Sequence, residues 1–276
     1  MDVARCTADG IVYTVELFEG RGDSFVSQYR RLLSCPECGG PAFYRRESTK
    51  GQAACFGARP HAVKCSLGAA EGRRAGTMGP GEQESIQPIE RILVDFNYGA
   101  HEEVNPDDPG QVVDPEGRGR RFTLGTGGRQ SQKHRRLSTL LKNLIYSPAF
   151  RNSEQLIALP KGEYRVKELF VEFPSVSETM VGSYRGFWGM VSDAAMHHPK
   201  GNESLWLNSG GRDAVSVVVD ADLGEAFQKR YPIFDPEKFA GSYVLVFGEL
   251  RLSQKNKLYI AVKELGQISL LLDDQQ

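Results

Sequence analysis

Apolar and polar residues alternate near the start of the chain in the manner of a half-buried strand. Ile11, Tyr13, Val15 and Leu17 recur in period two, which predicts a strand over Ile11 to Phe18. A short apolar run predicts a second strand over Arg91 to Phe96. Between these two strands, residues 68–89 are rich in Gly, Ala, Glu, Arg and Pro and lack periodicity, which is typical of a linker.

The hydrophobic period changes in the middle of the chain. A stripe at i, i+3, i+4 and i+7 predicts an amphipathic helix, which Pro148 ends; its apolar positions are Leu137, Leu140, Leu141, Leu144 and Ile145. The middle region, residues 71–174, is therefore expected to combine a linker, a basic arm and this helix.

Residues 175–276 read as a β domain with one helix. The expected elements are strands Tyr184 to Val191, Ser204 to Leu207 and Ala214 to Val219, a helix within Asp220 to Tyr231, and a hairpin of Ser242 to Leu252 with Lys257 to Val262. Five strands with a helix between the third and the fourth are the order of an OB-fold, a five-stranded barrel. We expect an α+β protein: an N-terminal zinc-finger module (1–70), the mixed middle region (71–174) and a C-terminal OB-like β-barrel (175–276).

Composition places the chain in the globular class without naming a partner. The 276 residues carry a net charge of −1, with 40% hydrophobic and 25% charged residues, so an argument for nucleic acid must come from local charge. No apolar run of about 18 residues predicts a membrane-spanning helix, and no signal core follows Met1. A cytoplasmic protein without membrane contact is the expectation.

Local charge changes sign within the middle region. Residues 68–117 hold eleven acids and three arginines, whereas residues 117–136 hold six arginines, one lysine, one histidine and no acid. The candidates for phosphate contacts are Arg118, Arg120, Arg121, Arg129, Lys133, Arg135 and Arg136. The alternative is a solvated loop that balances the acidic stretch before it.

Four of the five cysteines lie within 31 residues, which in a cytosolic chain indicates metal rather than disulfides. Cys35-Pro36-Glu37-Cys38-Gly39-Gly40 is a C-x-x-C knuckle, and Cys65 follows His61 by four residues. We expect one structural zinc ion on Cys35, Cys38, His61 and Cys65. Cys55 competes with His61 for the fourth position, and the compact H-x-x-x-C spacing favours His61.

The same residues carry a family resemblance. The knuckle with Pro41 and Phe43-Tyr44-Arg45-Arg46, then Phe56-Gly57-Ala58-Arg59-Pro60-His61 and Cys65, resembles the zinc finger that opens bacterial competence CoiA-like proteins. The resemblance covers residues 30–70. The nuclease-like domain that follows this finger in the family is not recognisable here, so nuclease activity is not carried over.

OB-folds bind single strands by stacking bases on exposed aromatic side chains beside basic residues. In the C-terminal domain the strongest candidates are Trp206, Arg251, Lys255 and Lys257. The other strand aromatics are further candidates, although most aromatics in a half-buried strand are core residues: Tyr184, Trp188, Tyr243, Phe247 and Tyr259.

These features together predict a bacterial, zinc-containing nucleic-acid-binding accessory protein of a DNA-processing or phage-defence system, with single-stranded DNA as its expected ligand. It is expected not to be an enzyme, since no nucleophile triad, acid pair or nucleotide fingerprint is found. One alternative is an adaptor subunit that docks proteins. The other is a metal-dependent nuclease that uses Asp95, Glu102 and Glu103.

Overall fold

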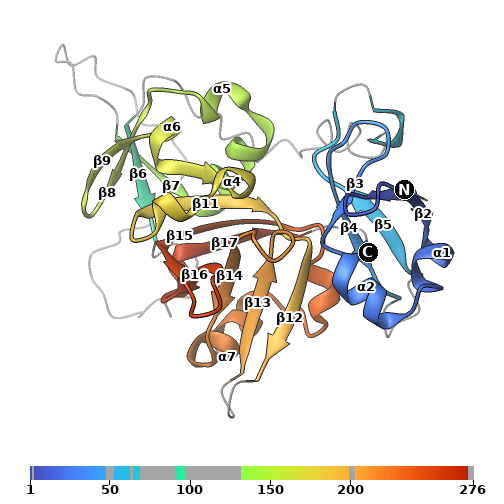
Figure 1. Cartoon of the computed structure of the whole chain (residues 1–276). Coiled ribbons are helices and arrows are strands. Elements are labelled where there is room, and N and C mark those ends of the chain that lie inside the picture. The colour runs from blue at the N-terminus through green and yellow to red at the C-terminus, as the bar shows by residue number, and fades with distance from the viewer. Residues whose placement is uncertain are drawn as a thin grey trace, which may run out of the picture.

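Three β-sheets with short helices around them make up the computed structural model (Figure 1). It describes Met1 and residues 3–47, 53–62, 65–68, 91–96, 132–198 and 203–272. No helix within these ranges is long and apolar enough to cross a membrane.

The N-terminal sheet is antiparallel and has the order β2-β1-β3-β4-β5. Its elements are β1 (Val3–Cys6), β2 (Val12–Thr14), α1 (Val15–Glu19), α2 (Asp23–Tyr29), β3 (Leu33–Ser34), β4 (Pro41–Arg45), β5 (Cys55–Ala58) and the 3-10 turn η1 (Ser66–Gly68). The rings of Phe18, Tyr44 and Phe56 lie 5.3–5.7 Å apart and form the centre of its core. Aromatic burial therefore stabilises this small module.

The strand predicted over Ile11 to Phe18 is only partly correct, because the chain leaves the sheet after Thr14. The Thr14 hydroxyl accepts a hydrogen bond from the Leu17 backbone N–H and caps α1. Ile11 and Leu17 are consequently exposed, and Phe18 is the residue that reaches the core. A local cap thus outweighs the period-two pattern.

The middle region forms a four-stranded sheet of order β7-β6-β8-β9, in which β6 runs parallel to both neighbours. Its elements are β6 (Arg91–Asp95), β7 (Gln132–Arg136), α4 (Leu137–Tyr146), α5 (Pro148–Arg151), β8 (Leu156–Leu159), β9 (Gly162–Arg165) and α6 (Val166–Leu169). The predicted helix is confirmed as α4, whose buried side chains are Leu137, Leu140, Leu141 and Leu144. The described end of the basic arm forms a strand, β7, rather than a loop.

The largest sheet has the order β10-β11-β15-β16-β14-β13-β12, and β17 pairs with β15. Its elements are β10 (Phe170–Glu172), η2 (Phe173–Ser175), η3 (Glu178–Met180), β11 (Tyr184–Met190), β12 (Asp193–His197), β13 (Ser204–Asn208), β14 (Ser216–Val219), α7 (Ala221–Arg230), η4 (Pro236–Phe239), β15 (Tyr243–Leu252), β16 (Leu258–Val262), η5 (Leu265–Gln267) and β17 (Ile268–Leu271). All five predicted strands and the helix are present. A closed five-stranded barrel is not confirmed, since no sheet of the described residues is closed.

The large sheet is covered unevenly. Alternate residues such as Val217, Val246 and Ile260 point into its own core, which α7 closes through Phe227. On the opposite face, Leu245 and Phe247 pack with Leu140 and the rest of a second core under α4. Within the described residues, the outer face of β13, β14 and β16 belongs to neither core: Trp206 and Tyr259 on this face are half-buried, and Ser216 and Val218 between them are buried.

The N-terminal module is docked on the large sheet rather than tethered to it. Arg30 makes an ion pair with Glu237, and Arg31 makes one with Asp193. The Arg45 guanidinium donates to the Ala240 carbonyl at 2.7 Å. Phe43 belongs to the core under α4 although its chain comes from the N-terminal sheet. The boundaries 1–70, 71–174 and 175–276 stay a prediction, and the cores they separate are in contact.

Candidate metal centre and nucleic-acid interface

The four predicted metal ligands come together at one point. The ligand atoms of Cys35, Cys38, His61 and Cys65 all lie within 4.8 Å of one another. The Sγ atoms of Cys35 and Cys65 are 3.7 Å apart, and the Sγ of Cys38 is 3.5 Å from the Nδ1 of His61. Three sulfurs and one imidazole at this spacing could hold a tetrahedral metal ion.

Glycines shape the knuckle in the way the sequence indicates. The Cys35 N–H donates to the Gly40 carbonyl at 2.7 Å, and the Gly39 N–H returns to the Cys35 carbonyl at 2.9 Å. Gly39 has φ +72°, a conformation that other residues rarely adopt. A Cβ on Gly40 would lie 2.5 Å from the Pro60 carbonyl oxygen. The glycines therefore allow the knuckle to close against the segment that carries His61.

Glu37 connects the two halves of the centre. Its carboxylate accepts hydrogen bonds from the Ser66 backbone N–H at 2.8 Å and from the Ser66 hydroxyl at 2.5 Å. The Ser66 hydrogen bonds lower the pKa of Glu37. Because Ser66 follows Cys65 directly, this carboxylate fixes the second half of the ligand set relative to the knuckle.

The cysteines of the cluster differ in their ease of ionisation. Burial disfavours the Cys38 thiolate, but hydrogen bonds from the backbone of Ala62 and Gly40 and from His61 outweigh it and lower the pKa of Cys38 to about 6. Burial, with the neighbouring sulfurs, raises the pKa of Cys65 to about 11. Thiolates this close together repel each other, and a cation bound among the sulfurs would offset that repulsion.

Cys55 is not part of the cluster. It begins β5 opposite Arg45 and is half-buried. The cluster therefore contains His61, and not Cys55, as its fourth member. Cys6 is buried in the N-terminal core and also lies outside the cluster.

Trp206 and Tyr259 form an aromatic pair on the uncovered outer face. Their ring centroids are 6.1 Å apart with an interplanar angle of 34°, and His197 meets the Trp206 ring edge-on at 6.1 Å. The Trp206 indole N–H donates to the Ser204 hydroxyl at 3.0 Å, which fixes the ring. Both rings are half-buried, so each keeps solvent-accessible surface. Tyr259 was a candidate for stacking with core burial as the alternative, and its register with Ser216 and Arg251 places it on the outer face.

Arg251 lies beside this pair, opposite Tyr259 in the β15–β16 ladder. It is half-buried, and Lys255 is exposed in the turn between the two strands. The Lys257 ammonium is engaged by carbonyls of the 211–214 loop, at 3.0 Å from Gly211, 3.1 Å from Arg212 and 2.5 Å from Ala214. Burial, together with nearby Arg31, lowers the pKa of Lys257 to about 8. Lys257 therefore supports a loop, while Arg251 and Lys255 reach solvent.

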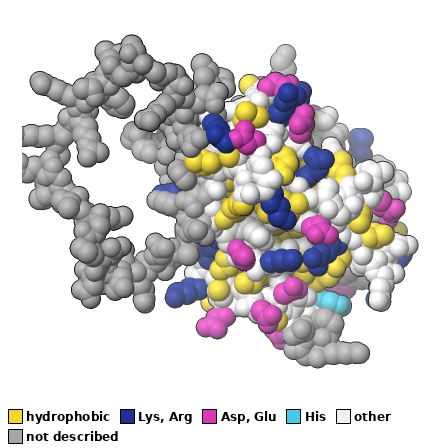
Figure 2. All heavy atoms as spheres, turned by 90° about the vertical axis from the view of Figure 1, so that its left-hand side faces the viewer, with side chains coloured by type: hydrophobic (Ala, Val, Ile, Leu, Met, Phe, Trp, Pro, Cys, Tyr) yellow, Lys and Arg dark blue, Asp and Glu magenta, His cyan; other side chains and the backbone are white. Residues whose placement is uncertain are grey.

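The basic stretch belongs to another part of the fold. Arg118, Arg120, Arg121 and Arg129 lie outside the described residues, as do Glu102 and Glu103. Lys133, Arg135 and Arg136 lie in β7 of the four-stranded sheet, and Arg135 is only 6% exposed. On the side of the molecule drawn in Figure 2, cationic and acidic side chains are interspersed over the coloured residues.

Comparisons with known proteins do not place the chain in a family. No protein-family model and no curated protein matches it. Among solved structures, the S. pombe Stn1–Ten1 complex is similar at 20% identity and a TM-score of 0.23, over 33% of this chain and 59% of that one. S. pombe Pot1pC bound to single-stranded DNA is similar at 12% identity and a TM-score of 0.26, over 39% and 88%. The resemblance of residues 30–70 to CoiA-like proteins stays a prediction.

Proposed function

We propose that this chain is a non-enzymatic protein that binds single-stranded nucleic acid, with DNA as the first ligand to test, across the outer face of β13, β14 and β16. The observation that carries the proposal is the Trp206–Tyr259 pair beside Arg251 on a face without a covering core. Bases stack on aromatic rings of this kind, and a guanidinium next to them meets the phosphate backbone.

The strand connections support an OB-like arrangement of this sheet. Only Val191 and Ser192 separate β11 from β12, and the path from β12 through β13, β14, β16 and β15 returns to β11. β14 runs parallel to β16, and α7 lies between β14 and β15 in the chain. OB-folds bind oligonucleotides on the face of their second and third strands, which here are β13 and β14.

Zinc is the metal proposed for the cluster, in a structural role. Three thiolates and one imidazole are a donor set that favours zinc over the harder cations, and four protein ligands leave no open position for water. Cys35 and Cys65 are buried, which agrees with a closed centre.

The decisive experiment is fluorescence anisotropy with labelled single-stranded and duplex DNA over a salt series. Trp206→Ala is expected to weaken single-strand binding about tenfold or more, since one stacked base contributes about 1–3 kcal/mol. Arg251→Ala should also flatten the plot of log affinity against log salt concentration by about the amount that one phosphate contact contributes. Matched controls are Phe234→Ala, which removes an aromatic ring that is 79% exposed elsewhere, and Lys229→Ala on α7. Wild-type protein without affinity for any strand at low salt would refute the proposal.

A second candidate function, protein docking, is favoured by a different surface. Phe234 is 79% exposed and Met196 is 42% exposed, and both line a hollow against α7 with Leu205 and Phe227. Exposed apolar side chains around a hollow are typical of protein-interaction sites. If this surface carries the function, Phe234→Asp abolishes salt-resistant co-purification of a partner, whereas Trp206→Ala leaves it intact. A place in a bacterial DNA-processing or phage-defence system stays a prediction.

A further inference from the structure

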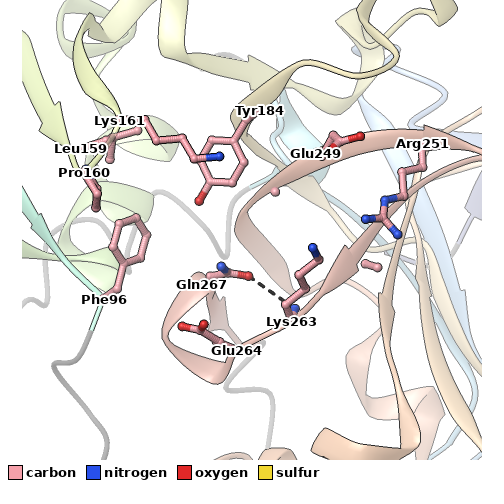
Figure 3. A pocket seen from close by; sticks show the side chains of 12 residues that line it. Phe96, Leu159, Pro160, Lys161, Tyr184, Glu249, Arg251, Lys263, Glu264 and Gln267 are labelled. Carbon is pink, nitrogen blue, oxygen red and sulfur yellow. Dashed lines mark hydrogen bonds between the residues drawn. The ribbon is translucent and has the colours of Figure 1, made fainter.

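A cleft opens where the β8–β9 turn faces the ends of β11, β15 and β16 (Figure 3). It has a volume of about 320 Å³ and lies between the four-stranded sheet and the large sheet. Its lining includes Phe96, Lys161, Tyr184, Arg251, Lys263 and Gln267. This volume is at the lower end of the range of ligand pockets, about 300–1,000 Å³. One small, flat ligand fits such a space.

Three cations converge on the cleft from different elements. Figure 3 shows Lys161 beside Tyr184, Lys263 on the opposite wall and Arg251 at one end. The Lys161 ammonium lies 5.1 Å from the centroid of the Tyr184 ring. Within the described ranges, the Arg251 guanidinium and the Lys263 ammonium have no hydrogen-bond acceptor or ion-pair partner. An anion entering the cleft would therefore meet charges that are not already neutralised by a contact.

Two acids also line the cleft, Glu249 and Glu264. Three cations against two carboxylates give a small positive excess, so the cleft does not simply concentrate any polyanion. The carboxylates can accept hydrogen bonds from sugar hydroxyls or base amino groups, and the Gln267 amide can donate or accept. The mixture of charges and hydrogen-bonding groups matches a ligand that combines a phosphate with a polar ring.

The end of the cleft away from Arg251 is apolar. Figure 3 shows Phe96, Leu159 and Pro160 there, on the side of the β8–β9 turn. Phe96 is held in place by the Phe247 ring, edge-on at 5.3 Å and 88°. A hydrophobic wall next to Tyr184 suits a nucleobase.

Arg251 belongs both to this cleft and to the proposed strand-binding face, because it is paired with Tyr259 in the ladder. Two residues further along β16, Ala261 lines the cleft on the same face as Tyr259. A single strand lying on Trp206 and Tyr259 would therefore lead past Arg251 directly into the cleft.

We propose that the cleft receives the terminal nucleotide of the bound single strand, with its terminal phosphate between Lys161, Lys263 and Arg251. A terminal phosphate monoester carries up to two negative charges, whereas an internal diester carries one, so three cations favour the end of a strand. This inference rests on the proposed function. It extends the interface by a site that distinguishes a phosphorylated end from the rest of a strand.

The test compares oligonucleotides of about 12 nucleotides with one sequence and four forms: a 5′-phosphate, a 3′-phosphate, hydroxyl ends and a covalent circle. Wild-type protein should bind one phosphorylated form about tenfold more tightly than the hydroxyl-ended and circular forms. The double variant Lys161→Met/Lys263→Met should lose this preference and keep its affinity for hydroxyl-ended DNA. Lys167→Met/Lys229→Met removes two exposed lysines elsewhere and should behave as wild type.

Each further outcome has a separate meaning. Equal affinity for all four forms, together with weakened binding in Trp206→Ala, refutes the proposed strand-end site and leaves the proposed function standing. No binding of any form overturns the proposed function and the strand end with it. The last measurement is a titration with a deoxynucleoside monophosphate. If the mononucleotide binds and the strand ends are not distinguished, the cleft is a site for a free nucleotide and the proposed strand-end site is refuted.

Discussion

Phe43 is one of the side chains through which the N-terminal module contacts the rest of the fold. Its chain position is in β4 of the N-terminal module, yet its ring lies in the core beneath α4. A Cβ on Gly241 would lie 2.2 Å from this ring, and Gly241 has φ +84°. The aromatic ring thus occupies the space that a side chain on residue 241 would need, in a backbone conformation that favours glycine.

Gly241→Ala should therefore destabilise the protein by about 2 kcal/mol, through left-handed strain and overpacking against Phe43. Urea unfolding followed by tryptophan fluorescence measures the change. Gly224→Ala is the matched control, because Gly224 lies within α7 and an added Cβ has no atom within 4 Å. The control should be neutral or stabilising by up to about 1 kcal/mol. Equal effects of the two substitutions would contradict the close approach of Phe43.

Residue chemistry was predictable where spacing alone defines it. The knuckle spacing identified Cys35 and Cys38, and the four-residue separation identified His61 and Cys65, which the cluster of ligand atoms supports. Positive charge was not sufficient to identify a ligand contact. Lys257 holds three loop carbonyls, and this depends on a loop about 45 residues away that no local pattern reveals.

At the scale of elements, prediction succeeded where one pattern was long and failed where a contact decided the outcome. The four buried leucines of α4 repeat over two turns, and this pattern alone was sufficient to predict the helix. β12 escaped notice because Asp193, Ala194 and Ala195 are not typical strand residues. Its pairing with β13 and the ion pair from Arg31 to Asp193 hold it in the sheet. This unrecognised strand forms one edge of the large sheet.

The proposed zinc site would join two short segments, the knuckle and the segment that carries His61 and Cys65. Cys38→Ser should remove the metal and destabilise the N-terminal module, because the knuckle and the His61–Cys65 segment lose their common centre. Metal content by mass spectrometry should fall from one zinc per chain to near zero. Cys55→Ser is the matched control and should retain the metal. Loss of metal in Cys55→Ser would show that the fourth ligand has been assigned wrongly, and retention of metal in Cys38→Ser would show that the knuckle does not hold the ion.

At the scale of the whole molecule, a buried ion pair secures the N-terminal module to the large sheet. Both guanidinium nitrogens of Arg30 contact the Glu237 carboxylate, at 2.7 and 2.5 Å, and Arg30 also donates to the Tyr44 carbonyl. Arg30 is 7% exposed. Removing one partner from such a pair leaves the other charge buried without compensation.

Arg30→Met should therefore lower the free energy of unfolding by about 3 kcal/mol at neutral pH. Thermal and urea unfolding measure the change. Arg165→Met, which removes an exposed arginine that pairs with Glu154, is the control and should cost less than about 1 kcal/mol. A cost for Arg30→Met no larger than that of the control would show that the pair does not secure the module.

The same pair gives a pH dependence with a defined sign. Burial disfavours the Glu237 carboxylate, but Arg30 outweighs it and keeps the pKa of Glu237 below its usual value of 4.5. A lowered carboxyl pKa stabilises the folded state above pH 4.5, and this contribution disappears as the pH falls through the folded-state pKa. The stability difference between wild type and Glu237→Gln should be largest near neutral pH and shrink below pH 4.5.

The docking of Phe43 against Gly241 also limits how this architecture can be rearranged. The N-terminal module could not be transplanted to another protein by exchanging residues 1–70 alone. Phe43 would lose the space next to Gly241, and Arg30 and Arg31 would lose their ion-pair partners Glu237 and Asp193. Chimaeras between relatives should therefore fold only when both sides of this contact are inherited together.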